Sequence, residues 1–144
     1  MAVITLSSVP QPTLWHDVPS VTLSYETLQQ RKAKVLSRMV QQGLDTLVIY
    51  ADKEHGGNFE YLTGFIPRFE EALLILQQTG EAALVLGNEN LKLAAHARLA
   101  NRVIHAPWFS LPNQPMDNQH SFPELLREAG LSGANTVGLA GWKL

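Results

Sequence analysis

The sequence predicts an α/β fold, a three-layer α/β/α sandwich with a mixed sheet. Short apolar runs alternate along the chain with segments of helical periodicity, which is the order expected when helices cover both faces of a sheet. Two of the apolar runs are separated only by a tight turn at 78–81, so they are expected to form an antiparallel hairpin. The hairpin makes the expected sheet mixed and not purely parallel.

The chain has 144 residues, 45% of them apolar and 17% charged, which suits a globular domain with a core of its own. A net charge of −2 offers no electrostatic basis for binding nucleic acid or an anionic membrane. The longest apolar stretches have about five residues, whereas a transmembrane helix needs about 20. Cysteine is absent, which excludes disulfides and thiolate chemistry and fits a reducing compartment. We therefore expect a cytoplasmic protein that binds neither nucleic acid nor membrane.

The first expected elements are an N-terminal arm and a long helix. Residues 1–23 contain three prolines and form the arm, in which Ala2–Leu6 is a candidate edge strand. Ser24 is a suitable N-cap for a helix beginning near Tyr25, and Gly43 stands where a left-handed residue would end it. The domain itself is expected to span 24–144.

Three strands are expected in the middle of the chain, at 46–50, 72–76 and 82–86. Between the first two, residues 51–58 are polar and predict a loop in which Asn58 caps the next helical turn. The apolar side chains that follow can pack inward from one short helix; they are Phe59, Leu62 and Phe65.

The last third of the chain predicts two helices and two strands. Asn88 is a candidate N-cap for a helix whose inner face is Leu91, Ala94, Ala95 and Leu99. Strands are expected at 103–105 and 136–139. Between them, Ser121 and Glu124 have the spacing of a capping box, and Gly130 is expected to end that helix.

The first polar cluster that could carry chemistry lies in the loop after the first expected strand. Asp52, Glu54 and His55 are suitable side chains for a metal or acid/base site. The simpler interpretation is a solvated loop, because three loop neighbours seldom converge on one ion without ligands from elsewhere. No nucleophile elbow, zinc-binding histidine pair, P-loop or dinucleotide-binding glycine motif occurs.

The second cluster centres on Arg68, which follows a proline and is flanked by aromatic residues. A guanidinium held in this loop could bind a carboxylate with two parallel hydrogen bonds. The alternative is a local ion pair with Glu70 or Glu71, which contributes little at a surface.

Three segments of the chain resemble a known family: Tyr50–His55, Asn58–Phe65 and Pro67–Leu74. They are similar to the N-terminal domain of the prolidase/creatinase/Xaa-Pro aminopeptidase family, peptidase family M24. The Tyr-Leu-Thr-Gly-Phe sequence at 61–65 is the most specific part. The likeness extends from about the first helix to the Gly141–Trp142 pair.

The resemblance implies a ribonuclease-H-like fold and a role beside a separate catalytic domain. In this family a C-terminal domain holds two divalent metal ions (Mn, Co or Zn) through two Asp, one His and two Glu. None of that ligand set can be placed in this chain. The resemblance therefore implies that residues 24–144 are a noncatalytic N-terminal domain, cut from a longer hydrolase of the aminopeptidase or dipeptidase type, with no metal site or catalytic residue of its own.

The resemblance also implies a position for the polar clusters, at the substrate entrance or at a subunit contact. The candidates are Phe65, Arg68 and Phe69, together with Asp52, Glu54 and His55. The expected partners are the chain's own C-terminal catalytic domain, further copies of the parent in a dimer or larger homo-oligomer, and a peptide or small amide substrate.

Three other functions are compatible with the sequence. The chain could be a free-standing ligand-binding or protein-interaction module that uses the same fold. It could belong to a creatinase-like amidinohydrolase, or it could be an independent hydrolase that uses Asp52, Glu54 and His55.

Overall fold

A computed structural model describes residues 4–12, 19, 21–99, 102–114, 120–131, 133 and 136–141. The elements follow one another as α1 (Tyr25–Gln42), β1 (Thr46–Ala51), α2 (Gly57–Thr63), β2 (Ala72–Gln77), β3 (Ala82–Leu86), η1 (Leu91–His96), β4 (Arg102–His105), η2 (Pro107–Phe109), α3 (Phe122–Leu126), η3 (Arg127–Leu131) and β5 (Val137–Ala140). Of the η elements, η1 and η2 are 3₁₀-helices and η3 is a π-helical turn.

The five strands form one mixed sheet in the order β4-β3-β2-β1-β5. The hairpin of β2 and β3 is antiparallel, and β2 also pairs with β1 in antiparallel fashion. The two outer strands are parallel to their neighbours, β5 to β1 and β4 to β3. The mixed α/β sheet predicted by the sequence is therefore confirmed.

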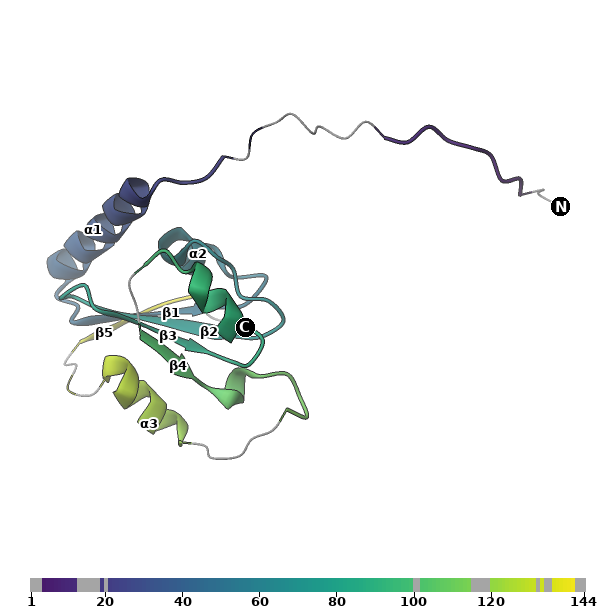
Figure 1. The fold of residues 1–144 in the computed structure, drawn as a ribbon. Coiled ribbons are helices and arrows are strands. Elements are labelled where there is room, and N and C mark those ends of the chain that lie inside the picture. The colour runs from purple at the N-terminus through teal and green to yellow at the C-terminus, as the bar shows by residue number, and fades with distance from the viewer. Residues whose placement is uncertain are drawn as a thin grey trace.

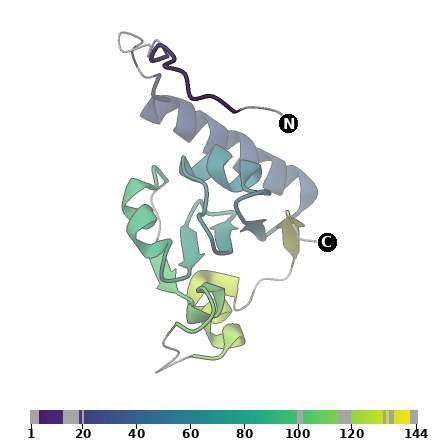
Figure 2. The ribbon, with the colours of Figure 1, turned by 90° about the vertical axis from the view of Figure 1, so that its right-hand side faces the viewer.

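Helices lie on both faces of this sheet, so the domain has three layers (Figures 1 and 2). Side chains alternate along β2: Leu74 and Leu76 join the core beneath α1 and α2, whereas Leu73 and Ile75 join the core on the α3 side. The central strands are buried on both faces because each face has its own helical cover. This explains why their sequences are continuous apolar runs without alternation.

The strand directions bring several loops to one edge of the sheet, by which we mean the edge where β1, β3 and β4 end and β2 begins. Ala72 at the start of β2 pairs with Ala51 at the end of β1 and with Leu86 at the end of β3. Leu86 in turn pairs with His105 at the end of β4. The segments 52–56, 64–71, 87–90 and 106–111 therefore meet at this edge, although they are far apart in the sequence.

Several of the predicted helix ends are confirmed. The Ser24 Oγ accepts a hydrogen bond from the Thr27 N–H at 3.1 Å, and Gly43 ends α1 with a φ of 65°. Glu124 accepts a hydrogen bond from the Ser121 N–H at 2.6 Å, as a capping box requires. Gly130 has a φ of 98°, a non-helical conformation one residue before η3 ends at Leu131.

Other local predictions were wrong. Residues 4–6 of the expected edge strand are exposed and pair with no other strand, and residues 2 and 3 lie outside the described residues. The helix expected after Asn88 is the 3₁₀-helix η1, whose N-cap is Asn90, and the Asn88 Oδ1 lies instead 2.7 Å from His105 Nε2. Ala95 is exposed and not on the inner face. Asn58 lies inside α2, whose N-cap is Gly56.

The end of the family resemblance falls partly outside the described residues. Gly141 is described, with a φ of 77°, whereas Trp142 is not. Within the described residues, none of the helices combines the length and the hydropathy that a transmembrane span requires.

Candidate functional site

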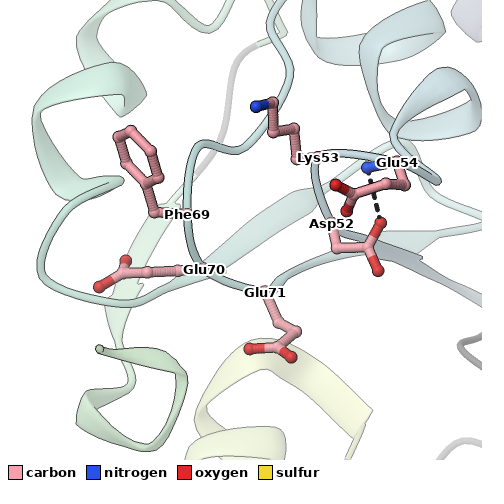
Figure 3. Close-up of a pocket in the computed structure, with 6 residues that line it drawn as sticks. All are labelled: Asp52, Lys53, Glu54, Phe69, Glu70 and Glu71. Carbon is pink, nitrogen blue, oxygen red and sulfur yellow. Dashed lines mark hydrogen bonds between the residues drawn. The ribbon is translucent and has the colours of Figure 1, made fainter. Parts of the chain in front are cut away.

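A pocket of about 280 Å³ opens at the sheet edge where β1 ends and β2 begins (Figure 3). Two loops supply its lining, the segment after β1 and the segment before β2. The lining residues are Asp52, Lys53, Glu54, Phe69, Glu70 and Glu71. Four of the six are acidic, so the pocket favours a cationic group over an anionic one.

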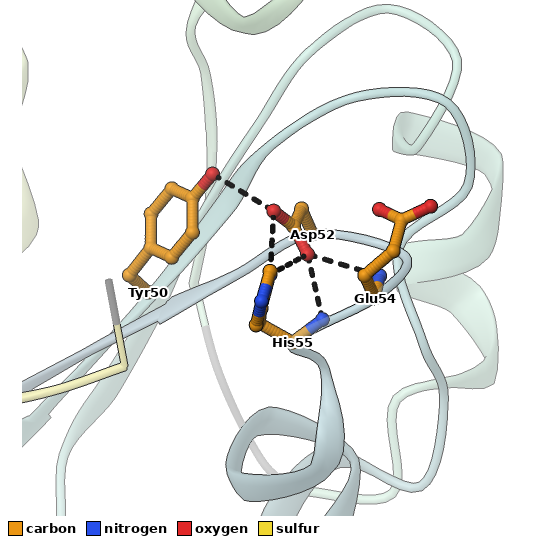
Figure 4. A network of polar contacts seen from close by, with 4 residues as sticks. All are labelled: Tyr50, Asp52, Glu54 and His55. Carbon is orange, nitrogen blue, oxygen red and sulfur yellow. Dashed lines mark hydrogen bonds and ion pairs between the residues drawn. The ribbon is translucent and has the colours of Figure 1, made fainter. Parts of the chain in front are cut away.

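Asp52 organises the loop that follows β1 (Figure 4). Its Oδ1 accepts hydrogen bonds from the backbone N–H of Glu54 at 3.0 Å and of His55 at 2.6 Å. The His55 Nδ1 lies 2.9 Å from Oδ1 and 3.1 Å from Oδ2, and the Tyr50 hydroxyl lies 3.3 Å from Oδ2. Asp52 as a whole is only 5% exposed, and both oxygens of its carboxylate have hydrogen-bonding partners.

These contacts shift the pKa values of Asp52 and Tyr50 in opposite directions. Burial would raise the pKa of Asp52, but the hydrogen bonds and charge of His55 and the Glu54 N–H outweigh it and lower that pKa below its usual range. Burial, together with the charges of Asp52 and Glu71, raises the pKa of Tyr50 to about 12. Asp52 is therefore ionised and Tyr50 neutral near pH 7, and a carboxylate of lowered pKa is a weak general base.

Glu70 holds the loop before β2 in place. It is only 3% exposed, yet four donors from distant segments surround its carboxylate. Oε2 accepts hydrogen bonds from the Glu89 N–H at 3.0 Å, the Asn90 N–H at 3.3 Å and the Asn90 Nδ2 at 3.4 Å, and Oε1 accepts one from the Leu111 N–H at 3.2 Å. The carboxylate thus connects three of the edge loops.

A glycine makes room for this contact. A Cβ atom at Gly87 would lie 2.5 Å from the Glu70 Oε2 and 2.7 Å from the backbone of Phe109. Any side chain at position 87 would therefore displace either the carboxylate or the segment around η2.

Arg68 and Phe69 project from the loop that Glu70 anchors. The Arg68 N–H donates to the Asn90 Oδ1 at 2.8 Å, so the backbone is fixed while the side chain is exposed. Phe69 is 64% exposed and has a φ of 65°, a strained conformation for a bulky residue. The Arg68 guanidinium carbon lies 5.5 Å from the centre of the Phe69 ring, within cation–π range.

The structure brings together some of the residues singled out in the sequence. Asp52, Glu54 and Phe69 line the pocket, and Arg68 lies beside Phe69. His55 binds Asp52, with 52% of its side chain exposed. Phe65 lies beneath the surface, 9% exposed, with its ring 5.2 Å from that of Phe59 in an edge-to-face contact. In the described part of the chain, no three His, Asp or Glu side chains are grouped as metal ligands.

The sequence does not indicate the residues that hold the site together. It suggests Glu70 only as an ion-pair partner for Arg68, whereas the carboxylate is occupied by backbone and amide N–H groups. No motif in the sequence points to a site role for Tyr50 or Asn90. The one available signal was a carboxylate directly before a continuous apolar strand, where burial, and hence a need for donors, could be anticipated.

Replacing Glu70 by glutamine should destabilise the domain by about 2–4 kcal/mol, because an amide cannot accept from four donors and carries no charge. Urea unfolding of Glu70→Gln measures the loss. Glu89→Gln is the matched control, since the Glu89 side chain is exposed. Equal stabilities for the two variants would show that the Glu70 contacts are not structural.

The Asp52 contacts should make stability pH-dependent. Because the folded-state pKa of Asp52 is lowered, its stabilising contribution is present above the unfolded pKa of about 4 and is lost as the pH falls through the folded value. Asp52→Asn should therefore be less stable than the wild type at pH 7, and the difference should shrink towards pH 2. Urea titrations at several pH values measure this, with exposed Glu54→Gln as control. A pH-independent difference would contradict the assignment.

Several solved structures share the fold. A proline dipeptidase from Streptococcus agalactiae has a TM-score of 0.56 at 12% identity, with 77% of this chain and 75% of that one covered. The creatinase/prolidase N-terminal domain of an X-Pro dipeptidase from Streptococcus pyogenes has 0.55 at 15% identity, with 76% and 80% covered. An Xaa-Pro dipeptidase from Bacillus anthracis has 0.53 at 9% identity, and this chain covers only 26% of it, with 78% of its own length matched. Comparison with curated protein sequences gave no match.

A family model gives the assignment directly. The model of the creatinase/prolidase N-terminal domain matches residues 31–143, which is most of the chain and includes every strand and every residue that lines the pocket. The resemblance seen in the sequence is confirmed, and the chain belongs to the creatinase/prolidase N-terminal domain family.

Proposed function

We propose that this domain is a noncatalytic part of an M24-type metal-dependent peptidase that acts on Xaa-Pro substrates, in which it shapes the substrate entrance and contributes to subunit contacts. The observation that carries the proposal is the rigid presentation of Arg68 and Phe69. Glu70 and Asn90 fix the backbone on both sides of Phe69, while the two side chains project into solvent.

The chemistry of the exposed pair suits a carboxylate-bearing substrate. A guanidinium can form two parallel hydrogen bonds with a carboxylate, and the neighbouring ring offers an apolar surface. The acidic pocket beside it would favour an amino group at the other end of a short peptide. Phe65 would contribute indirectly, by packing against Phe59 in the core beneath the loop.

The hydrolytic chemistry would come from a second domain. Two divalent metal ions there would activate water and polarise the scissile carbonyl. The residues described in this chain do not fit such a site, because their acidic side chains are either engaged in internal hydrogen bonds or not grouped as ligands. The partners that we propose are this catalytic domain, further copies of the parent in a dimer or larger assembly, and a peptide or small amide substrate. We also propose a location in the cytoplasm, because a chain without cysteine suits a reducing compartment.

The isolated 144-residue chain should not hydrolyse Xaa-Pro peptides when Mn²⁺ is added, because the acidic and histidine side chains of its described residues are not grouped as metal ligands. A ninhydrin or coupled proline assay over several hours measures this, with a purified M24 peptidase as the positive control. Turnover that persists after further purification and disappears with chelator would contradict the noncatalytic role and favour the independent hydrolase.

Arg68→Ala should lower kcat/KM about 10- to 100-fold in an enzyme that joins this domain to its catalytic domain, since one charge-assisted contact to the substrate is lost. The melting temperature should stay within about 2 °C, because the Arg68 side chain is exposed. Arg38→Ala is the matched control, since Arg38 is exposed on α1 and contacts Gln41. Unchanged kinetics with a large loss of stability would show a structural role instead.

A further inference from the structure

The side chain of Asn90 contacts the residues on both sides of Phe69. Its Oδ1 accepts a hydrogen bond from the Arg68 N–H at 2.8 Å, and its Nδ2 donates to the Glu70 Oε2 at 3.4 Å. A primary amide is the neutral side chain that offers an acceptor and a donor side by side, so it suits these two partners. Asn90 is fully buried, and its own backbone N–H and C=O are hydrogen-bonded where η1 begins. The amide therefore ties the loop before β2 to a turn that is itself held in place.

Phe69, which lies between these two contacts, has a backbone conformation that its side chain disfavours. Its φ is 65°, where the Cβ atom of a bulky residue crowds the adjoining carbonyl group. The residue is 64% exposed, and Figure 3 shows its ring standing away from the Glu70 side chain. Because the ring is mostly in solvent, packing does little to compensate for this strain. The compensation has to come from the hydrogen bonds that hold the adjoining residues.

We propose that Asn90 is a positioning residue of this site, whose amide clamps residues 68 and 70 and thereby keeps Phe69 left-handed. The clamp holds the Arg68 guanidinium beside the Phe69 ring, at the 5.5 Å separation described above. Its functional consequence rests on the proposed role of Arg68 and Phe69 at a substrate entrance: the pair is arranged before a substrate arrives. Without the clamp, the strain at Phe69 favours relaxation to a negative φ, and that rotation of the backbone carries the two side chains apart.

Removing the amide should release one end of the clamp and leave the other in place. Glu70 keeps three backbone donors, the N–H groups of Glu89, Asn90 and Leu111. The Arg68 N–H, by contrast, donates to the side chain that is removed. Asn90→Leu, which replaces the amide by an apolar group of similar volume, should therefore free the Arg68 side of the loop while the Glu70 side stays anchored.

Amide hydrogen exchange in the 144-residue chain tests the clamp at its own atoms. In the wild type the Arg68 amide should be protected although Arg68 is exposed, and Asn90→Leu should speed its exchange about tenfold or more. The amides of Glu89 and Leu111 are the internal control: their bonds to Glu70 remain, so their exchange should change by less than about twofold. An Arg68 amide that exchanges freely in the wild type, or equally fast in both proteins, would overturn the clamp.

Two substitutions at position 69 test the strain with Asn90 in place, so they are informative even if Asn90→Leu does not fold. Glycine adopts a left-handed φ freely, whereas alanine keeps the Cβ atom that causes the strain, and both remove the ring. Phe69→Gly should therefore have the higher urea midpoint of the two. At Lys53, which is exposed and has no positive φ, the order should be reversed, because glycine loses more chain entropy on folding. A Phe69→Gly variant less stable than Phe69→Ala would overturn the proposal.

Kinetics of an enzyme that joins this domain to its catalytic domain test the positioning role. Asn90→Leu should raise KM about fivefold and leave kcat within about twofold, as expected when about one molecule in five has the loop correctly arranged before binding. Because the clamp acts through Arg68, the double variant Arg68→Ala/Asn90→Leu should have the KM of Arg68→Ala alone. Asn58→Leu, at an exposed asparagine of α2, is the matched control and should leave KM unchanged.

The kinetic outcomes separate this proposal from the one on which it rests. A raised KM for Arg68→Ala with an unchanged KM for Asn90→Leu would overturn the positioning role alone. Additive effects in the double variant would show that Asn90 acts independently of Arg68, which also overturns it. If neither single variant changes KM, the proposed substrate contact fails and the positioning role fails with it, whereas the exchange of the Arg68 amide still decides whether the clamp exists.

Discussion

The buried carboxylate of Glu70 is the contact on which the geometry of the candidate site depends. A charge withdrawn from water is costly unless it is fully hydrogen-bonded. Glu70 meets this condition with donors 19, 20 and 41 residues further along the chain, at Glu89, Asn90 and Leu111. Because the carboxylate needs all of them, the loops that follow β3 and η2 and the loop before β2 must be in place together. The edge of the sheet is thereby rigid even though it is made of loops.

This rigidity explains the contrast between the inner and outer residues of the site. Asp52 and Glu70 lie inside, with their oxygens engaged by N–H groups, so they position the backbone and have little capacity left for chemistry. Arg68 and Phe69 lie outside on the same loop, exposed and held beside each other. This arrangement, with two exposed side chains held on a loop by buried carboxylates, is the basis of the role that we propose beside a separate catalytic domain.

The sequence predicts this fold well where the determinants are local. The cap at Ser24, the left-handed glycines at 43 and 130 and the hairpin turn at 78–81 depend on residues close in sequence, and all are present in the structure. The site was harder to predict because its partners are distant. Arg68 next to Glu70 suggested an ion pair, but the donors to Glu70 come from loops that only the strand order brings near. Asn88 is a plausible cap in the sequence, but its Oδ1 lies beside His105 Nε2 in the fold, and Asn90, which precedes η1, donates its side-chain N–H to Glu70.

Amide hydrogen exchange at Asn90 and Leu111 tests the central role of Glu70 most directly. Both N–H groups lie in loops, yet both donate to the buried carboxylate. If Glu70 holds the edge loops together, these amides should exchange as slowly as those of the central strands, because they open only when the whole edge opens. Exchange as fast as that of the exposed arm at residues 4–9 would contradict the account.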